Sequence, residues 1–253
     1  MNDSKINDEL VKAQPSFARL IPNILTIASL GFGLTAIKLA LSGKWEQAIL
    51  CILVAMCLDG LDGRIARFMG VTSNFGAQLD SLCDMVNFGV CPPVVFYLWA
   101  AAHQQLKPFS WALILLYVMC MAIRLARFNV TALEEHDDSK LNEHFIGVPA
   151  PAGAFLILLP IMISFELEFH NLFDYNALIG YVAIIGLLLA SRIPTLSLKK
   201  VKINPSTVWI VMLACGMLLS FIIIEPWVVL PLVGILYLIT IPVFALKFKK
   251  AHR

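Results

Sequence analysis

Long apolar segments alternate with short polar ones along almost the whole sequence. A bilayer core about 30 Å thick is crossed by a helix of roughly 20 mostly apolar residues, and most of these segments approach that length. The pattern therefore predicts an all-α protein, a polytopic membrane helical bundle with about eight transmembrane helices. The expected spans cover approximately residues 20–41, 46–68, 75–101, 109–128, 151–165, 177–189, 207–224 and 228–246. We expect Pro92 and Pro93 to break or kink the third span, because proline has no backbone N–H to donate.

The composition supports a membrane protein and gives no indication of a nucleic-acid partner. Of the 253 residues, 59% are hydrophobic and 14% are charged, whereas soluble domains are about half apolar and about a quarter charged. All nineteen lysines and arginines except Lys38, Lys44 and Lys107 fall on one side of the expected series of helices. By the positive-inside rule, both termini and the polar ends of the second and third spans are expected in the cytoplasm.

Four aspartates interrupt the apolar pattern at the end of the second span and within the third. Asp59 and Asp62 share one side of a helix, and Asp80 and Asp84 lie four residues apart on the next one. Ionisable groups in membrane helices are costly and usually functional. If the two faces meet, carboxylates about 6 Å apart repel by roughly 3 kcal/mol per pair at an effective dielectric constant of about 20. A divalent cation would relieve this repulsion and would also bind phosphate oxygens. A transporter cavity and a buried salt-bridge cluster are the alternatives.

These aspartates belong to a longer motif with fixed spacing. It reads Asp59-x-x-Asp62-Gly63-x-x-Ala66-Arg67, then eight residues, then Gly76-x-x-x-Asp80-x-x-x-Asp84. This motif resembles the signature of the CDP-alcohol phosphatidyltransferases, which displace CMP from a CDP-linked donor with an alcohol. The resemblance implies that Asp59, Asp62 and Asp80 hold a divalent metal, Mg or Mn, as two ions. Asp84 is implied as a further metal ligand beside them and as the general base.

The resemblance also implies residues that bind the CDP-lipid donor. Arg67 is expected to pair with donor phosphate, because a guanidinium matches two phosphate oxygens at once. Gly63 and Gly76 leave room for the nucleotide against the backbone, and close packing of membrane helices is a second role for such glycines. Asn23 and Thr26 share a face near the start of the first span. They are expected either to contact the donor head group or to cap the helix.

Three further stretches resemble the integral-membrane phosphatidylserine synthases. They are Asn87 to Pro93, Arg124 to Asn129, and Phe145 to Pro151. This likeness implies CDP-diacylglycerol as donor, L-serine as acceptor, and phosphatidylserine and CMP as products. Asn87, Arg124 and Arg127 are then candidate acceptor-binding residues, although both arginines can also serve as anchors at the membrane surface. Asn87 departs from these relatives, in which a serine is frequent.

Other acceptors within the same family stay open on this sequence, namely choline, glycerol 3-phosphate or an inositol phosphate. A cation-coupled transporter is the alternative from another class. The resemblance further implies a homodimer among the lipids of a bacterial or archaeal cytoplasmic membrane, with its active site facing the cytoplasm. We divide the chain into a tail or surface helix at 1–19, a six-helix family core at 20–192, and two additional helices with a basic tail at 193–253.

Overall fold

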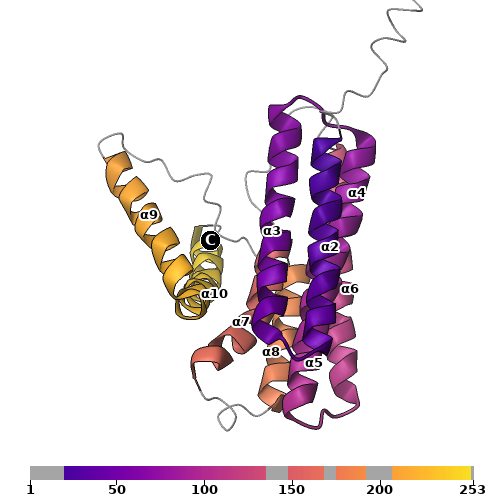
Figure 1. Ribbon diagram of the computed structural model, residues 1–253, viewed down its shortest axis with the longest axis vertical. Helices are drawn as coiled ribbons and strands as arrows, with labels where there is room; N and C mark the ends of the chain where they lie inside the picture. The colour runs from indigo at the N-terminus through magenta and orange to yellow at the C-terminus, as the bar shows by residue number, and fades with distance from the viewer. Residues whose placement is uncertain (1–19, 135–147, 168–174, 192–206, 252–253) are drawn as a thin grey trace, which may run out of the picture.

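The computed structural model describes residues 20–134, 148–167, 175–191 and 207–251. This part of the chain contains helices and no strand, which confirms the all-α prediction. The elements are α2 (Ile21–Leu41), α3 (Trp45–Phe68), α4 (Asn74–Asp84), the π-helix η2 (Met85–Val90), α5 (Cys91–His103), α6 (Phe109–Glu134), α7 (Ala150–Glu166), α8 (Tyr175–Ala190), α9 (Val208–Ile224) and α10 (Pro226–Ala251). Figure 1 shows α2 to α8 as a bundle of roughly parallel and antiparallel helices. The tail at 1–19 lies outside the described residues.

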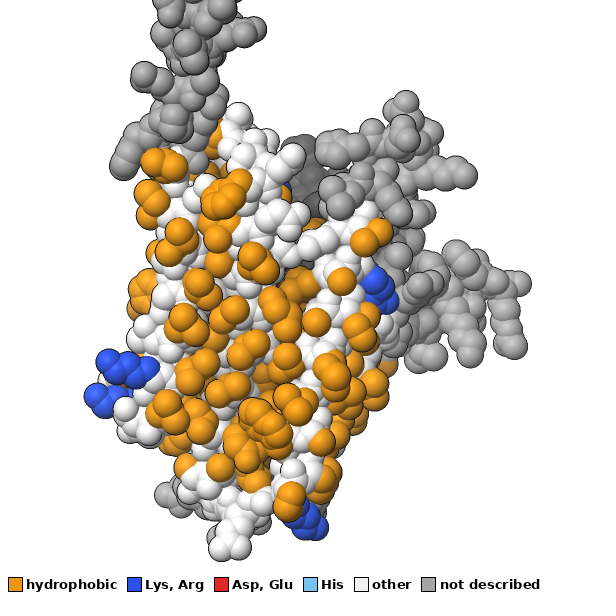
Figure 2. Space-filling model, turned by 90° about the vertical axis from the view of Figure 1, so that its right-hand side faces the viewer, with side chains coloured by type: hydrophobic (Ala, Val, Ile, Leu, Met, Phe, Trp, Pro, Cys, Tyr) orange, Lys and Arg blue, Asp and Glu red, His pale blue; other side chains and the backbone are white. Residues whose placement is uncertain are grey.

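The helices have the length and surface of membrane spans. Three are long and apolar enough to cross a bilayer, at Ile21–Leu41, Asn74–His103 and Phe109–Thr131, and shorter apolar helices follow. Figure 2 shows a face on which hydrophobic side chains extend from end to end, with lysines and arginines only near its edges. Such a surface is suited to lipid, and it indicates an integral membrane protein. A count of eight spans and the cytoplasmic position of the termini stay predictions.

The first helix packs through a face made of small side chains. The buried residues of α2 are Pro22, Thr26, Ser29, Gly33, Ala36 and Ala40. Small side chains let helix backbones approach closely. In lipid, which is as apolar as the protein core, this close packing is the main source of helix association. Figure 1 shows α2 between α3 and α4, and α2 contacts both. This arrangement packs α3 and α4, the two helices that carry the aspartates, against the same helix.

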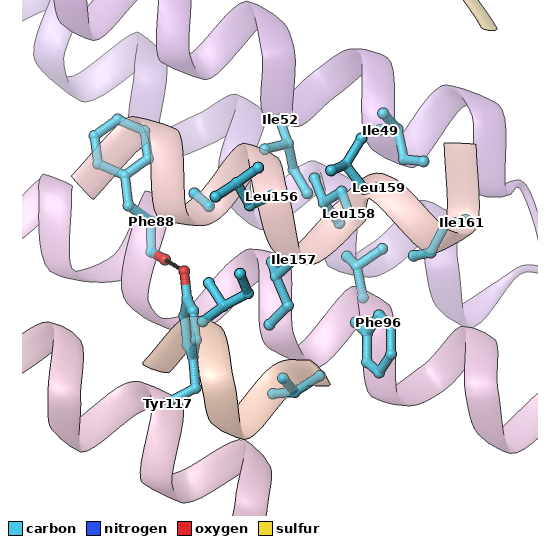
Figure 3. Close-up of a cluster of buried hydrophobic side chains, with 14 of the residues drawn as sticks. Ile49, Ile52, Phe88, Phe96, Tyr117, Leu156, Ile157, Leu158, Leu159 and Ile161 are labelled. Atoms are coloured by element: carbon cyan, nitrogen blue, oxygen red, sulfur yellow. Dashed lines mark hydrogen bonds between the residues drawn. The ribbon is translucent and has the colours of Figure 1, made fainter. Parts of the chain in front are cut away.

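The helix α7 lies at the centre of the hydrophobic core. Figure 3 shows Leu156, Ile157, Leu158, Leu159 and Ile161 among side chains from the surrounding helices. All five are at most 3% exposed. Because consecutive residues of a helix point in different directions, α7 is buried on every side. It contacts α3, α5, α6, α8 and α10.

The two C-terminal helices differ in how they contact the bundle. The helix α10 packs on α7, where the rings of Phe165 and Trp227 meet edge to face with centroids 4.7 Å apart. Gly234 of α10 lies directly against the Leu159 side chain. The helix α9 has no buried residue and contacts chiefly α10, and Figure 1 shows it apart from the main bundle.

The expected break at Pro92 and Pro93 does not occur. Both prolines lie in the first turn of α5, and the six residues before α5 form η2, at whose end the Cys91 N–H reaches the Val86 carbonyl five residues back. Proline is tolerated in a first helical turn because little donor capacity is lost there. The wider π turn changes the hydrogen-bond pattern, so that the two prolines fall in a first turn and the helix does not end there. One helical path therefore runs from Asn74 to His103.

A third proline within a helix is accommodated by a tyrosine. Pro160 of α7 has no N–H for the Leu156 carbonyl four residues earlier. The Tyr181 hydroxyl of α8 donates to that oxygen at 2.5 Å. The tyrosine therefore replaces the donor that the proline lacks.

Gly33→Ala is expected to lower the free energy of unfolding by about 1–3 kcal/mol, the usual cost of overpacking a core. An added Cβ would lie 2.2 Å from the Oδ1 of Asn87, which is buried. Gly31→Ala is the matched control on the same helix, because nothing lies within 4 Å of a Cβ added there. It should be neutral or slightly stabilising, since alanine favours helix over glycine. Thermal unfolding in detergent compares the two, and equal melting temperatures would contradict this packing.

Candidate active site

A tight turn reverses the chain between α3 and α4 at one end of the bundle. Gly70 adopts a φ of 63° in this turn, a left-handed conformation that glycine takes at no steric cost. Ser73 then caps α4, and its Oγ accepts a hydrogen bond of 3.0 Å from the Gly76 N–H. The turn and the cap direct α4 back along the bundle, so that the polar faces of α3 and α4 meet.

Three of the four predicted aspartates converge. One carboxylate oxygen each from Asp59, Asp62 and Asp80 lies within 4.8 Å of the others. Asp62 is only 3% exposed, and the Oδ1 of Asp59 is buried without a hydrogen-bond partner among the described residues. At this separation the charges repel by roughly 3 kcal/mol per pair at an effective dielectric constant of about 20. A hard divalent cation fits a site of three carboxylates, one of which has an unpartnered buried oxygen.

The fourth aspartate, Asp84, lies beside this group and is not one of its three members. Its carboxyl group interacts at short range with that of Asp59, and its Oδ1 is also buried without a hydrogen-bond partner in the described part of the chain. Arg124 of α6 is near enough to interact with the Asp84 charge. The predicted set of four metal ligands thus separates into a cluster of three and one carboxylate next to it.

Thr26 supports Asp62 directly. Its Oγ1 lies 2.5 Å from the Oδ2 of Asp62, and 3.0 Å from the Pro22 carbonyl of its own helix. The Gly63 N–H also donates to Asp62. We predicted Thr26 as a contact to the donor or a cap, and the structure shows in addition a hydrogen bond to a candidate metal ligand. The spacing of polar residues on α2 was the signal, but spacing does not identify a partner on another helix.

An open cavity leads to the aspartates. It encloses about 570 Å³, including its mouth. All five residues predicted to bind the donor lie in its wall: Asn23, Thr26, Gly63, Arg67 and Gly76. Asp62 and Asp80 line it as well. The cavity thus joins candidate metal ligands to a basic side chain, which suits a phosphate-bearing ligand.

The two cavity glycines differ in their surroundings. Nothing lies within 4 Å of a Cβ added at Gly63, so this glycine borders open space. A Cβ at Gly76 would lie 3.0 Å from the Oδ1 of Asn23 and 3.2 Å from the Oγ of Ser73. Room for a ligand is therefore the better explanation for Gly63, and close packing explains Gly76.

The three predicted acceptor-binding residues make internal hydrogen bonds and do not line this cavity. The Nε of Arg124 donates to the Val148 carbonyl at 2.5 Å, and an Nη of Arg127 donates to the Ala190 carbonyl at 2.6 Å. Asn87 is 1% exposed and donates to the Oγ of Ser29. Their role in acceptor binding stays a prediction.

One contact near the aspartates was not expected from the sequence. The Nδ2 of Asn129, at the end of α6, donates to the Oγ of Ser81 at 2.7 Å. Ser81 directly follows Asp80, so this bond fixes α4 against α6 beside the carboxylates. Asn129 belongs to a stretch singled out above, but a single sequence does not show which serine it meets.

Comparison with known proteins identifies the family of this chain. Residues 19–240 match the family described as CDP-alcohol phosphatidyltransferase. A CDP-diacylglycerol–serine O-phosphatidyltransferase of Mycobacterium leprae is 36% identical over 228 residues, covering 88% of this chain and 74% of the relative. A Helicobacter pylori protein of the same name is 34% identical over 220 residues, covering 87% and 88%. Among solved structures, the phosphatidylinositol phosphate synthase (PgsA1) of Mycobacterium tuberculosis, crystallised with manganese and citrate, gives a TM-score of 0.48 at 19% identity over 74% of this chain and 83% of that one.

The chain belongs to the CDP-alcohol phosphatidyltransferase family. It is an integral membrane enzyme that transfers a phosphatidyl group from a CDP-alcohol donor. The transporter alternative is thereby set aside.

Thr26→Val is expected to raise the Mn²⁺ concentration for half-maximal activity by about 10- to 100-fold, as is usual when the partner of a metal ligand is removed. Valine keeps the shape of threonine but removes the donor to Asp62. Thr26→Ser retains the hydroxyl and is the control, with near-normal Mn²⁺ dependence. Mn²⁺ titrations of activity, with calorimetry as a second readout, measure the effect. Identical behaviour of the two variants would contradict a supporting role for the hydroxyl.

Proposed function

We propose that the protein is a CDP-diacylglycerol–serine O-phosphatidyltransferase, which converts CDP-diacylglycerol and L-serine to phosphatidylserine and CMP. The observation that carries this proposal is the cluster of Asp59, Asp62 and Asp80 beside a cavity lined by Arg67. The choice of serine is supported by the names of relatives that are 36% and 34% identical and that align with most of the chain. Choline, glycerol 3-phosphate and inositol phosphate are the competing acceptors.

The three clustered aspartates are the residues that would hold a divalent cation, Mg²⁺ or Mn²⁺. Their unpartnered buried oxygen and their mutual repulsion both favour a cation at this position. The neighbouring Asp84 offers a further oxygen, which supports the expectation of two ions. When bound, such a cation neutralises the diphosphate and stabilises charge on the attacking and leaving oxygens.

The residues of the chain have separate tasks in the transfer. Arg67 is exposed at the cavity wall and pairs with the donor diphosphate. Gly63 leaves space for the nucleotide beside α3. Asp84 takes the proton of the acceptor hydroxyl. The hydroxyl oxygen forms a bond to the phosphorus that carries diacylglycerol, the bond from that phosphorus to the CMP oxygen breaks, and CMP leaves.

Arg124 is the strongest of the acceptor-binding candidates. Among the described residues, the Val148 carbonyl engages only its Nε, and its charge lies near Asp84. The remaining guanidinium N–H groups can hold the carboxylate of serine in two-point fashion close to the general base. Arg127 and Asn87 contribute by fixing α6 and η2. Choline has no carboxylate, so this interaction would discriminate against it.

The setting of the enzyme is also part of the proposal. The distribution of basic residues supports an active site facing the cytoplasm of a bacterial or archaeal cell, with both termini on that side. We also propose the division of the chain into residues 1–19, 20–192 and 193–253. By analogy with the family, we propose a homodimer.

Purified enzyme supplied with CDP-diacylglycerol, a divalent cation and one labelled alcohol at a time is expected to release CMP with L-serine. It should release much less with choline, glycerol 3-phosphate or inositol phosphate. Detection of both CMP and the labelled lipid separates transfer from hydrolysis. Product with another alcohol and none with serine would overturn the choice of acceptor while leaving the family assignment intact.

Asp84→Asn is expected to reduce kcat by about 100- to 10,000-fold, the usual contribution of a general base, while binding of CDP-diacylglycerol largely survives. Asp59→Asn should instead shift the Mn²⁺ dependence together with activity, because it removes a ligand. Both changes remove a charge from a crowded carboxylate group, so stability should not fall. Addition of a chelator should stop the wild-type reaction, and Mn²⁺ or Mg²⁺ should restore it. Normal turnover in either variant would count against the role assigned to that aspartate.

A further inference from the structure

The backbone carbonyl of Phe88 has no possible donor within its own helix. In an α-helix its donor would be the N–H of residue 92, and in a π-helix that of residue 93. Both positions are proline, which has no N–H. Phe88 is 0% exposed, so its carbonyl needs a partner from another element.

Tyr117 of α6 supplies that partner. Its hydroxyl donates to the Phe88 carbonyl at 3.2 Å, as Figure 3 shows. Tyr117 is itself 0% exposed, and α8 approaches its backbone closely at Gly186, where an added Cβ would lie 3.1 Å from the Tyr117 Cα. Packing therefore keeps Tyr117 in place, and its hydroxyl holds η2 against α6.

A second hydrogen bond holds η2 against α2. The Nδ2 of Asn87 donates to the Oγ of Ser29 at 2.6 Å, and Ser29 donates to the Ala55 carbonyl of α3 at 3.0 Å. The helix α3 carries Asp59 and Asp62. The π turn is thus connected to the helix that bears the other carboxylates and, independently, to α6.

The π turn determines which way Asp84 faces. A π turn holds about one residue more than an α turn, which rotates the preceding helix by roughly 100° relative to a continuous α-helix. In a continuous α-helix, Asp84 would share a face with Phe88, Cys91 and Val95, because these lie 4, 7 and 11 residues further on. All three are 0% exposed and belong to the core. With the π turn in place, Asp84 instead meets Asp59.

We propose that Tyr117 is a positioning residue for the transfer reaction, which holds η2 through the Phe88 carbonyl and so directs Asp84 to the acceptor. This inference rests on the proposed function of Asp84. Tyr117 does not touch the reacting atoms in this account. It acts through a single hydroxyl group, and its removal should affect the catalytic step more than the binding of the donor.

The experiment compares Tyr117→Phe with Tyr181→Phe. Each change removes one tyrosine hydroxyl from a carbonyl that a proline leaves without its donor, and only the first holds η2, the turn that follows Asp84. Tyr117→Phe is expected to lower kcat by about 10- to 100-fold, the scale seen for a misplacement of about 1 Å, with an unchanged KM for CDP-diacylglycerol. Tyr181→Phe should keep the wild-type kcat. Melting temperatures in detergent record any loss of stability in both.

A second-site change tests whether the hydroxyl acts through the carbonyl. In Tyr117→Phe/Pro93→Ala, residue 93 regains an N–H at the spacing of a π turn from Phe88, and kcat should recover at least in part. This double variant also keeps the test informative if Tyr117→Phe alone is too unstable to purify. Equal kcat in Tyr117→Phe and Tyr181→Phe, or no recovery in the double variant, would overturn the inference. Activity retained in Asp84→Asn would instead overturn the role proposed for Asp84, on which this inference rests.

Discussion

Mutual repulsion among carboxylates in an apolar bundle is the constraint on which the rest of this structure depends. Charges in such surroundings are stable only if each has a donor, a counter-charge or a cation. The protein supplies some of these itself: Thr26 and the Gly63 N–H reach Asp62, and Arg124 lies near Asp84. Buried oxygens on Asp59 and Asp84 have no partner within the described residues. The fold thus holds the aspartates in place and leaves part of their charge to be balanced by what binds.

The helix α2 holds the neighbouring elements in place through hydrogen bonds. Thr26 contacts Asp62 of α3, and Ser29, one turn further on, connects the Ala55 carbonyl of α3 with Asn87 of η2. Gly33, the next member of the same face, leaves room for the Asn87 amide. Successive polar and small residues on one helix therefore fix two elements that are distant in sequence. A face of larger apolar residues would hold the helices together without fixing the carboxylates.

Periodicity and motif spacing predicted a large part of this protein. The helical class follows from the apolar segments, and the convergence of Asp59, Asp62 and Asp80 follows from their positions on two helices joined by a short turn. The π-helix could not be predicted, because Met85–Val90 has no composition that separates it from an α-helix. Pro92 and Pro93 showed that the regular pattern must change there. What replaced the expected break depends on Tyr117, which lies on another helix.

The positions of Asp84 and of the two arginines show a second limit of prediction from the sequence. Spacing places Asp80 and Asp84 on one stripe, and the family resemblance implied that both are metal ligands. Only Asp80 joins the cluster of three, and Asp84 meets Asp59 beside that cluster. Likewise, sequence alone does not show that Arg124 and Arg127 each bond to a backbone carbonyl of another helix.

The position of α10 has a consequence for how the protein is made. The central helix α7 is buried on one side by α10, whose Gly234 lies against Leu159, and α10 leaves the ribosome after α7. Until α10 is made, that side of α7 has only lipid to cover it. The helix α10 therefore completes the cover of α7, and a nascent chain that stops before residue 226 would carry the aspartate motif on an unfinished scaffold.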